Sequence, residues 1–195
     1  MNIGLDIDDV LSNTHEVLIK YAQIFAETYL SRNIAKYDSN NFREVLDCTP
    51  EEEQKYYRTY YTTVLKELIP KSGVKEILTK MQEEGHKIIL ITVRSDKECE
   101  GSAYEITKEW LEKYKIPYDE LITGAFHKKE ACANYGVNVF VDDSVKNCEE
   151  VSELDIPVFL MNAPFNILYK DTDRIKRVEH MIDLYHKMNE LKDVN

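Results

Sequence analysis

The sequence predicts an α/β fold in which a Rossmann-like parallel sheet is flanked by helices and carries one helical insertion. Two patterns indicate this fold. Short apolar runs alternate with amphipathic segments, and one interval between the runs is much longer than a crossover helix requires. The 195 residues are enough for one buried core, and the hydrophobic fraction of 43% is ordinary for a globular protein.

Five apolar runs have the length of strands, and segments with a helical period separate the later ones. The expected strands are residues 2–7, 86–93, 120–123, 138–141 and 156–161, and the expected helices between them are residues 74–84, 103–114, 128–135 and 147–154. This alternation predicts helices on both faces of the sheet. The last segment, residues 173–192, is expected to form one amphipathic helix.

The interval between the first two strands holds more chain than one crossover needs. Residues 15–30 and 49–70 both have the pattern of amphipathic helices, and Thr49 and Pro50 suit the N-cap and the first position of the second helix. We therefore expect a helical domain at residues 13–70, standing over the C-terminal end of the first strand. Residues 1–12 and 71–195 would form the core domain.

Four tyrosines of the second inserted helix recur at spacings of i and i+4. They are Tyr56, Tyr57, Tyr60 and Tyr61. This spacing is typical of the packed faces of a helix, so packing within the helical domain is the default interpretation. The alternative is that one of these rings stacks on a nucleobase.

Composition and charge exclude several classes of partner. The formal net charge of −11 argues against a nucleic-acid polymer or an anionic membrane, because basic surfaces bind both. The four cysteines form no CxxC pair and are typical of free thiols in a reducing compartment. No apolar stretch approaches the roughly 20 residues that span a bilayer, and the N-terminus is acidic where a signal peptide would be basic. We therefore expect a cytoplasmic protein.

Acidic residues crowd the end of the first expected strand, where Asp6, Asp8 and Asp9 follow an apolar run. Like charges this close together are unfavourable unless a cation lies among them. Ligands of open α/β sheets bind outside the carboxyl ends of the strands, so polar residues after other strands should meet these acids at one edge. Those residues are Thr92, Arg94, Asp142 and Asp143, together with Lys128 or Lys129 at the start of a helix.

The chemistry of this set indicates phosphoryl transfer. Residues two apart in an extended segment face the same side, so Asp6 and Asp8 point into the same space. With Asp143 they would form an oxygen-rich site suited to Mg²⁺. One carboxylate can attack phosphorus, while a second protonates the leaving oxygen and later deprotonates a water molecule.

Four short motifs resemble those of the haloacid dehalogenase-like phosphatases, in the same order along the chain. They are DIDDV (6–10), ITVRS (91–95), the HKK region (127–129) and FVDDS (140–144). The helical insertion resembles the small type 1 cap of that superfamily. With the later MNAPFN (161–166), the motifs look most similar to those of the 5′(3′)-deoxyribonucleotidases and their bacterial nucleotidase relatives.

This resemblance implies a Mg²⁺-dependent phosphomonoester hydrolase that works through an aspartyl-phosphate. Asp6 would be the nucleophile and Asp8 the general acid and base, and both would bind the metal, Asp8 also through its backbone carbonyl. Thr92 would bind phosphoryl oxygens. Lys128, eight positions before Gly136, is the better match to the third motif, with Lys129 as the alternative.

The acidic pair and Arg94 complete the expected site. By the same resemblance, Asp143 aligns with the metal-binding acid, and Asp142 would steady the lysine or a metal-bound water. Arg94 is expected to bind the substrate, although an ion pair with a surface acid is the alternative. The sequence departs from the family pattern at Asp9, where glycine is common. It also departs at residues 12–15, which hold SNTH where characterised deoxyribonucleotidases place an aromatic residue against the base.

The expected substrate is a small phosphomonoester, with a (deoxy)nucleoside monophosphate favoured and a sugar phosphate as the alternative. A phospho-accepting receiver module also gathers aspartates, a threonine and a lysine at strand ends. In a receiver, however, the acidic pair precedes the acceptor aspartate, whereas here the DxD motif comes first. The order of the motifs therefore favours the hydrolase.

Overall fold

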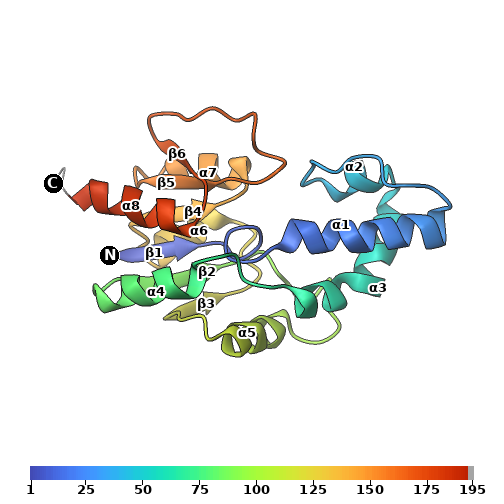
Figure 1. The fold of residues 1–195 in the computed structure, drawn as a ribbon, viewed down its shortest axis with the longest axis horizontal. Helices are drawn as coiled ribbons and strands as arrows, with labels where there is room; N and C mark the ends of the chain where they lie inside the picture. The colour runs from blue at the N-terminus through green and yellow to red at the C-terminus, as the bar shows by residue number, and fades with distance from the viewer. Residues whose placement is uncertain (193–195) are drawn as a thin grey trace.

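A computed structural model describes residues 1–192 of the chain. Within them, six parallel strands form one sheet in the order β3-β2-β1-β4-β5-β6 (Figure 1). The strands are β1 (Asn2–Leu5), β2 (Lys87–Ile91), β3 (Glu120–Ile122), β4 (Val139–Asp142), β5 (Val158–Met161) and β6 (Ile175–Val178). The first strand lies in the middle of the sheet, between β2 and β4, so the residues that follow it emerge at the centre of the carboxyl edge.

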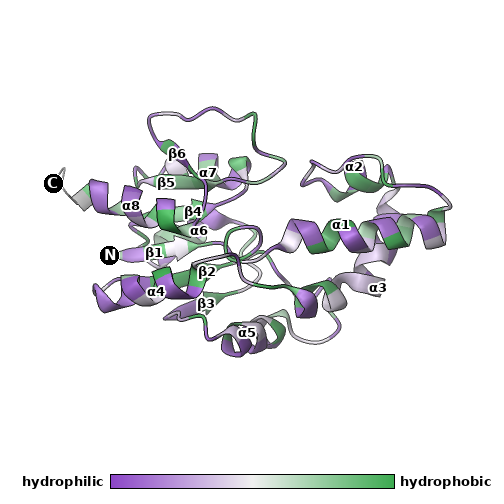
Figure 2. Ribbon diagram, in the orientation of Figure 1, coloured by the Kyte–Doolittle hydropathy of each residue, from purple (hydrophilic) through white to green (hydrophobic). Residues whose placement is uncertain are grey.

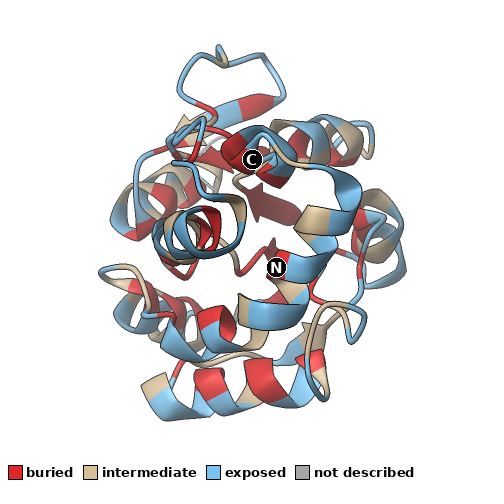
Figure 3. Ribbon diagram, turned by 90° about the vertical axis from the view of Figure 1, so that its right-hand side faces the viewer, coloured by how far each residue is buried: buried red, intermediate tan, exposed pale blue. Residues whose placement is uncertain are grey.

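Five helices cover the two faces of the sheet. The buried side chains of α4 (Val74–Glu83), α5 (Ala103–Tyr114) and α8 (Met181–Lys192) pack with one set of strand residues, and those of α6 (Lys128–Asn134) and α7 (Val145–Ser152) pack with the other set. The four inner strands β1, β2, β4 and β5 are almost wholly buried, as a parallel sheet covered on both faces requires, and the surrounding helices are exposed on their outer faces (Figure 3). The prediction of a parallel sheet covered on both faces is confirmed.

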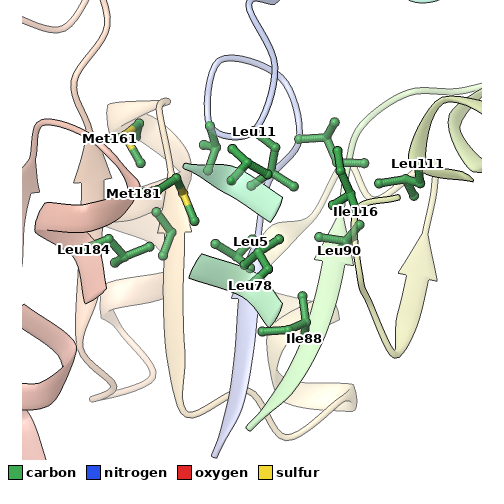
Figure 4. Packing of buried hydrophobic residues seen from close by; sticks show 14 of the residues in the cluster. Leu5, Leu11, Leu78, Ile88, Leu90, Leu111, Ile116, Met161, Met181 and Leu184 are labelled. Atoms are coloured by element: carbon green, nitrogen blue, oxygen red, sulfur yellow. The ribbon is translucent and has the colours of Figure 1, made fainter. Parts of the chain in front are cut away.

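The larger of the two cores lies under α4, α5 and α8. In it Leu5 of β1 and Leu90 of β2 pack against Leu78 of α4, and Met181 and Leu184 extend the cluster under α8 (Figure 4). All these side chains are buried. Hydropathy follows the same division, with apolar residues on the strands and polar residues on the outer helix faces (Figure 2). Burial of this apolar surface holds the carboxyl edge of the sheet in place.

The segment between β1 and β2 forms a separate group of helices, here called the helical lobe (residues 14–67). It consists of α1 (Thr14–Phe25), a π-helical turn (Ala26–Leu30), α2 (Phe42–Leu46) and α3 (Pro50–Glu67). The lobe stands beyond the carboxyl ends of the strands (Figure 1). It has its own core, in which Phe25, Phe42 and Tyr56 pack together. Thr49 caps α3 in a reciprocal capping box with Glu52, as its sequence indicates.

The two chain segments that connect the lobe to the sheet run side by side. Ser12 and Pro70 form an antiparallel bridge, the Asn13 side chain accepts a hydrogen bond from Ile69 N at 2.9 Å, and Lys71 N donates to the Leu11 carbonyl at 2.8 Å. The lobe therefore enters and leaves at one point, next to the end of β1.

The structure corrects the expectation for residues 173–192, which do not form one helix. Residues 175–178 form β6, which pairs with β5, and the helix begins only at Met181. Ile175 and Val178 are buried there while Lys176 is exposed. So short a strand shows too little alternation to be distinguished from the first turn of an amphipathic helix, and pairing with β5 decides the outcome.

Two smaller differences concern the lobe. The helix expected at residues 15–30 changes from α-helical to π-helical hydrogen bonding at Ala26, and it ends at Ser31 in the left-handed conformation. The short helix α2 was not anticipated from the sequence. Its N-cap is Asn41, whose side chain accepts a hydrogen bond from Arg43 N at 3.2 Å.

Candidate active site

The carboxyl edge of the sheet brings the predicted site residues together. Asp6 directly follows β1, and its backbone N–H continues the ladder to the Val141 carbonyl of β4 at 2.9 Å. Thr92 directly follows β2. Asp142 ends β4, and Asp143 is the first residue beyond it. Parallel pairing of β1 with both β2 and β4 thus places these groups at one edge.

Asp6 forms a buried ion pair with Lys128. The Lys128 ammonium donates to Asp6 Oδ1 and to the Ile91 carbonyl, and it lies 3.4 Å from Asp142 Oδ2. Burial raises the pKa of Asp6 to about 7, although Lys128 opposes the rise. Burial alone would lower the pKa of Lys128, but the Asp6 and Asp142 carboxylates outweigh it and raise that pKa. Lys129 instead pairs with Glu153 at the surface, so Lys128 is the one of these two lysines that lies among the acids of the sheet edge.

The Asp8 carboxylate is held by the side chain of a buried arginine, Arg94. Arg94 Nε donates to Asp8 Oδ2 at 3.0 Å and Arg94 Nη2 donates to Oδ1 at 2.7 Å, a bidentate pair. The hydroxyls of Thr14 and Thr92 also donate to this carboxylate, at 2.7 and 3.3 Å. Burial would raise the pKa of Asp8, but the Arg94 charge outweighs it and keeps the pKa below its ordinary value. Asp8 is therefore held as an ionised, fixed carboxylate.

Arg94 itself is buried behind Asp8. Its exposed fraction is 1%, its remaining nitrogen Nη1 donates to Thr107 Oγ1 at 3.3 Å, and its guanidinium lies 6.0 Å from the centroid of the Trp110 ring. Arg94 therefore pairs with Asp8 inside the protein and does not line the cavity. The sequence analysis had expected Arg94 to contact the substrate. The geometry favours a role in positioning Asp8.

The acidic pair after β4 has two different environments. The Asp142 carboxylate accepts hydrogen bonds from Ser144 N at 2.8 Å and from Asn147 Nδ2 at 3.1 Å, besides facing Lys128. The Asp143 carboxylate has no such donor from another residue within the described chain. Burial and the neighbouring carboxylates of Asp142 and Asp6 raise the pKa of Asp143 well above its ordinary value. Asp143 therefore has no direct ion pair within the described chain, although Lys71 and Lys128 act on it from a distance.

The charges of the edge do not balance. Five carboxylates gather there against three cations, so the fully ionised site carries two excess negative charges; the acids are Asp6, Asp8, Asp9, Asp142 and Asp143, and the cations are Lys71, Arg94 and Lys128. No three acidic, histidine or cysteine side chains of residues 1–192 are arranged as a metal cluster. A site made of two carboxylates and one backbone carbonyl needs no such cluster, and Mg²⁺ commonly takes few protein ligands and keeps several waters. The residues present therefore fit a divalent cation.

Asp9 occupies a special backbone position in the turn after β1. Its φ is +54°, in the left-handed region where glycine is favoured and aspartate is tolerated. The Asp9 carboxylate accepts a hydrogen bond from His15 N at 2.9 Å, and the Asp9 carbonyl accepts one from the Lys71 ammonium. Aspartate is thus compatible with this turn, where the family resemblance described above leads us to expect glycine.

A cavity of about 760 Å³ lies between the sheet edge and the helical lobe. Asp6, Asp8 and Asp143 line its floor, and Phe42, Tyr57 and Tyr61 line the side formed by the lobe. Phe126 and Phe165 of the core complete the wall. Thr92, Arg94 and Lys128 are buried behind the carboxylates and do not line it. The cavity is large enough for an organic leaving group above a phosphate-sized space.

The family model described as "5′ nucleotidase, deoxy (Pyrimidine), cytosolic type C protein" matches residues 1–189. The chain belongs to this nucleotidase family. It is therefore a phosphoric monoester hydrolase of the haloacid dehalogenase-like superfamily, and this excludes the receiver alternative.

Known proteins agree with the family assignment over most of the chain. The YqfW protein of Bacillus subtilis is 29% identical over 195 residues, covering 98% of this chain and 95% of that protein. Nucleotidase CA_C3379 of Clostridium acetobutylicum is 25% identical over 169 residues, covering 85% and 82%. The haloacid dehalogenase-like protein SP0104 from Streptococcus pneumoniae shares the fold, with a TM-score of 0.67 at 14% identity, covering 96% of this chain and 97% of that one.

Several residues of this nucleotidase-family site were not found from the sequence. Thr14 binds Asp8, Asn147 binds Asp142, and Lys71 reaches the turn after β1 from the far end of the helical lobe. Thr14 is the first residue of α1 and Lys71 lies in the second connecting segment, and no local pattern reveals that either reaches the site. Ser144 and Asn147 carry a detectable signal, since Ser144 caps α7 three residues before Asn147.

Within residues 1–192, no helix is both long and apolar enough to cross a membrane. All four cysteines are free, with Cys132 and Cys148 buried.

Proposed function

We propose that the chain is a Mg²⁺-dependent cytoplasmic nucleotidase that hydrolyses (deoxy)nucleoside monophosphates through an aspartyl-phosphate on Asp6. The observation that carries the proposal is the pair of carboxylates at the end of β1, each of which is held by a different buried cation. Asp6 faces the cavity beside Lys128, and Asp8 is fixed by Arg94 and Thr14. Family membership supports the substrate class, and residues 13–70 would serve as the cap over the leaving group.

In this mechanism, Asp6 attacks the phosphorus and the bond between phosphorus and the ester oxygen breaks. Asp8 is ionised in the free site, so it first takes the proton of a phosphomonoester bound as its monoanion and then gives that proton to the leaving oxygen. Asp8 then removes a proton from the water that hydrolyses the acyl phosphate. The bidentate contact with Arg94 keeps the Asp8 carboxylate in a single orientation for both proton transfers. Lys128 keeps Asp6 oriented and offsets part of the charge that the phosphoryl group brings.

Asp6, the Asp8 carbonyl and Asp143 are the groups that would hold Mg²⁺. When bound, the ion would neutralise phosphoryl oxygens and remove the two excess negative charges of the edge. Asp142 would remain outside the metal contacts, because its oxygens are already occupied by Ser144, Asn147 and Lys128.

A panel of phosphomonoesters assayed with and without Mg²⁺ tests the proposal. Nucleoside 5′- and 3′-monophosphates, their deoxy forms, sugar phosphates and p-nitrophenyl phosphate should be compared by phosphate release. We expect Mg²⁺-dependent release with the highest kcat/KM on a nucleotide. If sugar phosphates are hydrolysed as well as any nucleotide, the proposed substrate class is wrong, while the assignment as a phosphomonoester hydrolase is unaffected.

Replacing the acids after β4 one at a time separates their roles. Asp143→Asn is expected to raise the Kd for Mg²⁺ by about 100-fold, because it removes a metal ligand, whereas Asp142→Asn should raise it only about 10-fold. The measurement is a Mg²⁺ titration followed by the melting temperature, which binding to the native state raises. The reverse order of the two variants would place Asp142 on the metal.

The lobe tyrosines differ in their access to substrate. Tyr57 and Tyr61 line the cavity, whereas Tyr60 packs on Tyr21 with ring centroids 5.2 Å apart. If a nucleobase stacks on the lobe, Tyr57→Ala or Tyr61→Ala should raise KM for a nucleotide about 5- to 100-fold, since stacking contributes about 1–3 kcal/mol. Turnover of p-nitrophenyl phosphate should hardly change.

Tyr60→Ala is the matched control, because this half-buried ring packs against the core of the lobe and does not line the cavity. It should lower the melting temperature and leave the KM ratio of the two substrates unchanged. If the Tyr57 and Tyr61 variants behave like Tyr60→Ala, these rings serve packing and the base binds elsewhere.

A further inference from the structure

The loop after β5 reaches back to the acidic pair through one buried side chain. Asn166 is 3% exposed, and its amide nitrogen donates to two carbonyl oxygens, those of Asp143 and Met161, each at 2.8 Å. Its amide oxygen accepts from Ala163 N at 3.1 Å and from Arg177 Nη1 at 2.8 Å. Every polar atom of this side chain is therefore engaged.

The two carbonyls belong to the next pair in the register of the sheet. The strands β4 and β5 pair Phe140 with Val158, Val141 with Phe159 and Asp142 with Leu160, so Asp143 stands opposite Met161. The backbone ladder between these strands ends one pair earlier. The Asn166 amide therefore links the two strands one pair beyond the backbone ladder, because it joins the first residue after β4 to the last residue of β5.

Arg177 of β6, at the edge of the sheet, holds Asn166 in position. Its Nη1 donates to the side-chain oxygens of Asn162 at 2.6 Å and Asn166 at 2.8 Å, and its Nη2 donates to the carbonyls of Asn166 and Tyr169 at 2.8 and 2.9 Å. Four hydrogen bonds from one planar guanidinium leave the loop little freedom. The same loop presents Phe165 to the cavity, where its ring lies 5.2 Å from that of His15.

We propose that Asn166, held by Arg177, is a positioning residue that fixes the backbone of Asp143 and so orients its carboxylate toward the metal. The Asp143 side chain has no donor of its own from another residue of the described chain, so the backbone is what sets its direction. Groups that orient a metal ligand typically change metal affinity 10- to 100-fold when they are lost. The metal role of Asp143 is part of the proposed function, on which this inference rests.

The test is a calorimetric Mg²⁺ titration of the intact chain without substrate. Asn166→Ala is expected to raise the Kd for Mg²⁺ about 10-fold, while kcat at saturating Mg²⁺ stays within about threefold of the wild type, because the ligand remains and only its orientation is lost. Arg177→Lys should also raise the Kd, because an ammonium cannot make the same fork of hydrogen bonds. The rise should be smaller than for Asn166→Ala, because the Asn166 side chain that contacts Asp143 remains. Arg174→Met is the matched control, because Arg174 is exposed and pairs with Asp155; its Mg²⁺ affinity should equal that of the wild type.

The outcomes are separable. An Asn166→Ala variant that is folded, as judged by circular dichroism, and binds Mg²⁺ like the wild type overturns the inference. Should Asn166→Ala not fold, Arg177→Lys decides by the same titration, and unchanged affinity there overturns it equally. If the wild type itself binds no Mg²⁺, the proposed metal-dependent function fails together with this inference. Equal weakening by Arg174→Met would show a general loss of the sheet edge and also overturn it.

Discussion

Asp6→Asn is expected to abolish phosphate release, with kcat lowered about 10⁴-fold or more, as for other enzymes that lose their nucleophile. An amide has the shape of the carboxylate but cannot form an acyl phosphate. The fold should survive, because Lys128 keeps Asp142 and the Ile91 carbonyl as partners. Burial raises the pKa of Asp6 to about 7, so the replacement also removes a carboxyl group whose ionised form is unfavourable there.

The measurement is phosphate release together with the melting temperature. Asp173→Asn is the control, since this aspartate is exposed and does not line the cavity. It should have wild-type activity. Turnover by Asp6→Asn near that of the wild type would disprove the covalent mechanism, whatever the substrate.

Arg94→Met should be the most damaging change outside the acids themselves. It leaves the Asp8 carboxylate partly buried without its counter-ion, and breaking a buried pair costs about 3–5 kcal/mol in the free energy of unfolding. Asp8 would also lose the bidentate contact that orients it, so kcat should fall by about 100-fold or more while KM changes little. Arg94→Lys should restore only part of the loss, because an ammonium cannot bind both oxygens in the same way.

Unfolding by urea and steady-state kinetics measure the two effects. Lys108→Met, which removes a partly exposed ion pair with Glu112, is the control and should change neither quantity appreciably. A rise in KM at constant kcat and constant stability would instead mean that Arg94 contacts the substrate, as the sequence analysis expected.

The sheet and the position of the acids were predictable because both follow from local patterns. Apolar runs of strand length mark β1, β2 and β4, and in a parallel sheet their ends meet at one edge. The order of Asp6, Thr92, Lys128 and Asp143 along the chain then predicts which groups gather there. The prediction needed only approximate strand positions. An error of one or two residues in a strand boundary still leaves these side chains at the same edge of the sheet.

The partners of those groups could not be predicted in the same way. That Arg94 points inward to Asp8 depends on the pocket formed by Thr107 and Trp110 of α5. The strand β6 was missed because four residues with two buried positions fit a helix equally well. Arg177 lies on that strand, so its contacts with Asn166 were missed with it.

The paired connecting segments of the helical lobe also bear on how the chain folds. Strand β1 must find β2 across a long intervening segment, and closing so long a loop costs conformational entropy. The lobe has contacts that are nearer in sequence and a core of its own. Once it has formed, Asn13 and Ile69, 56 positions apart, are joined by a hydrogen bond. A lobe that folds early would therefore shorten the effective loop between the two central strands and favour their pairing.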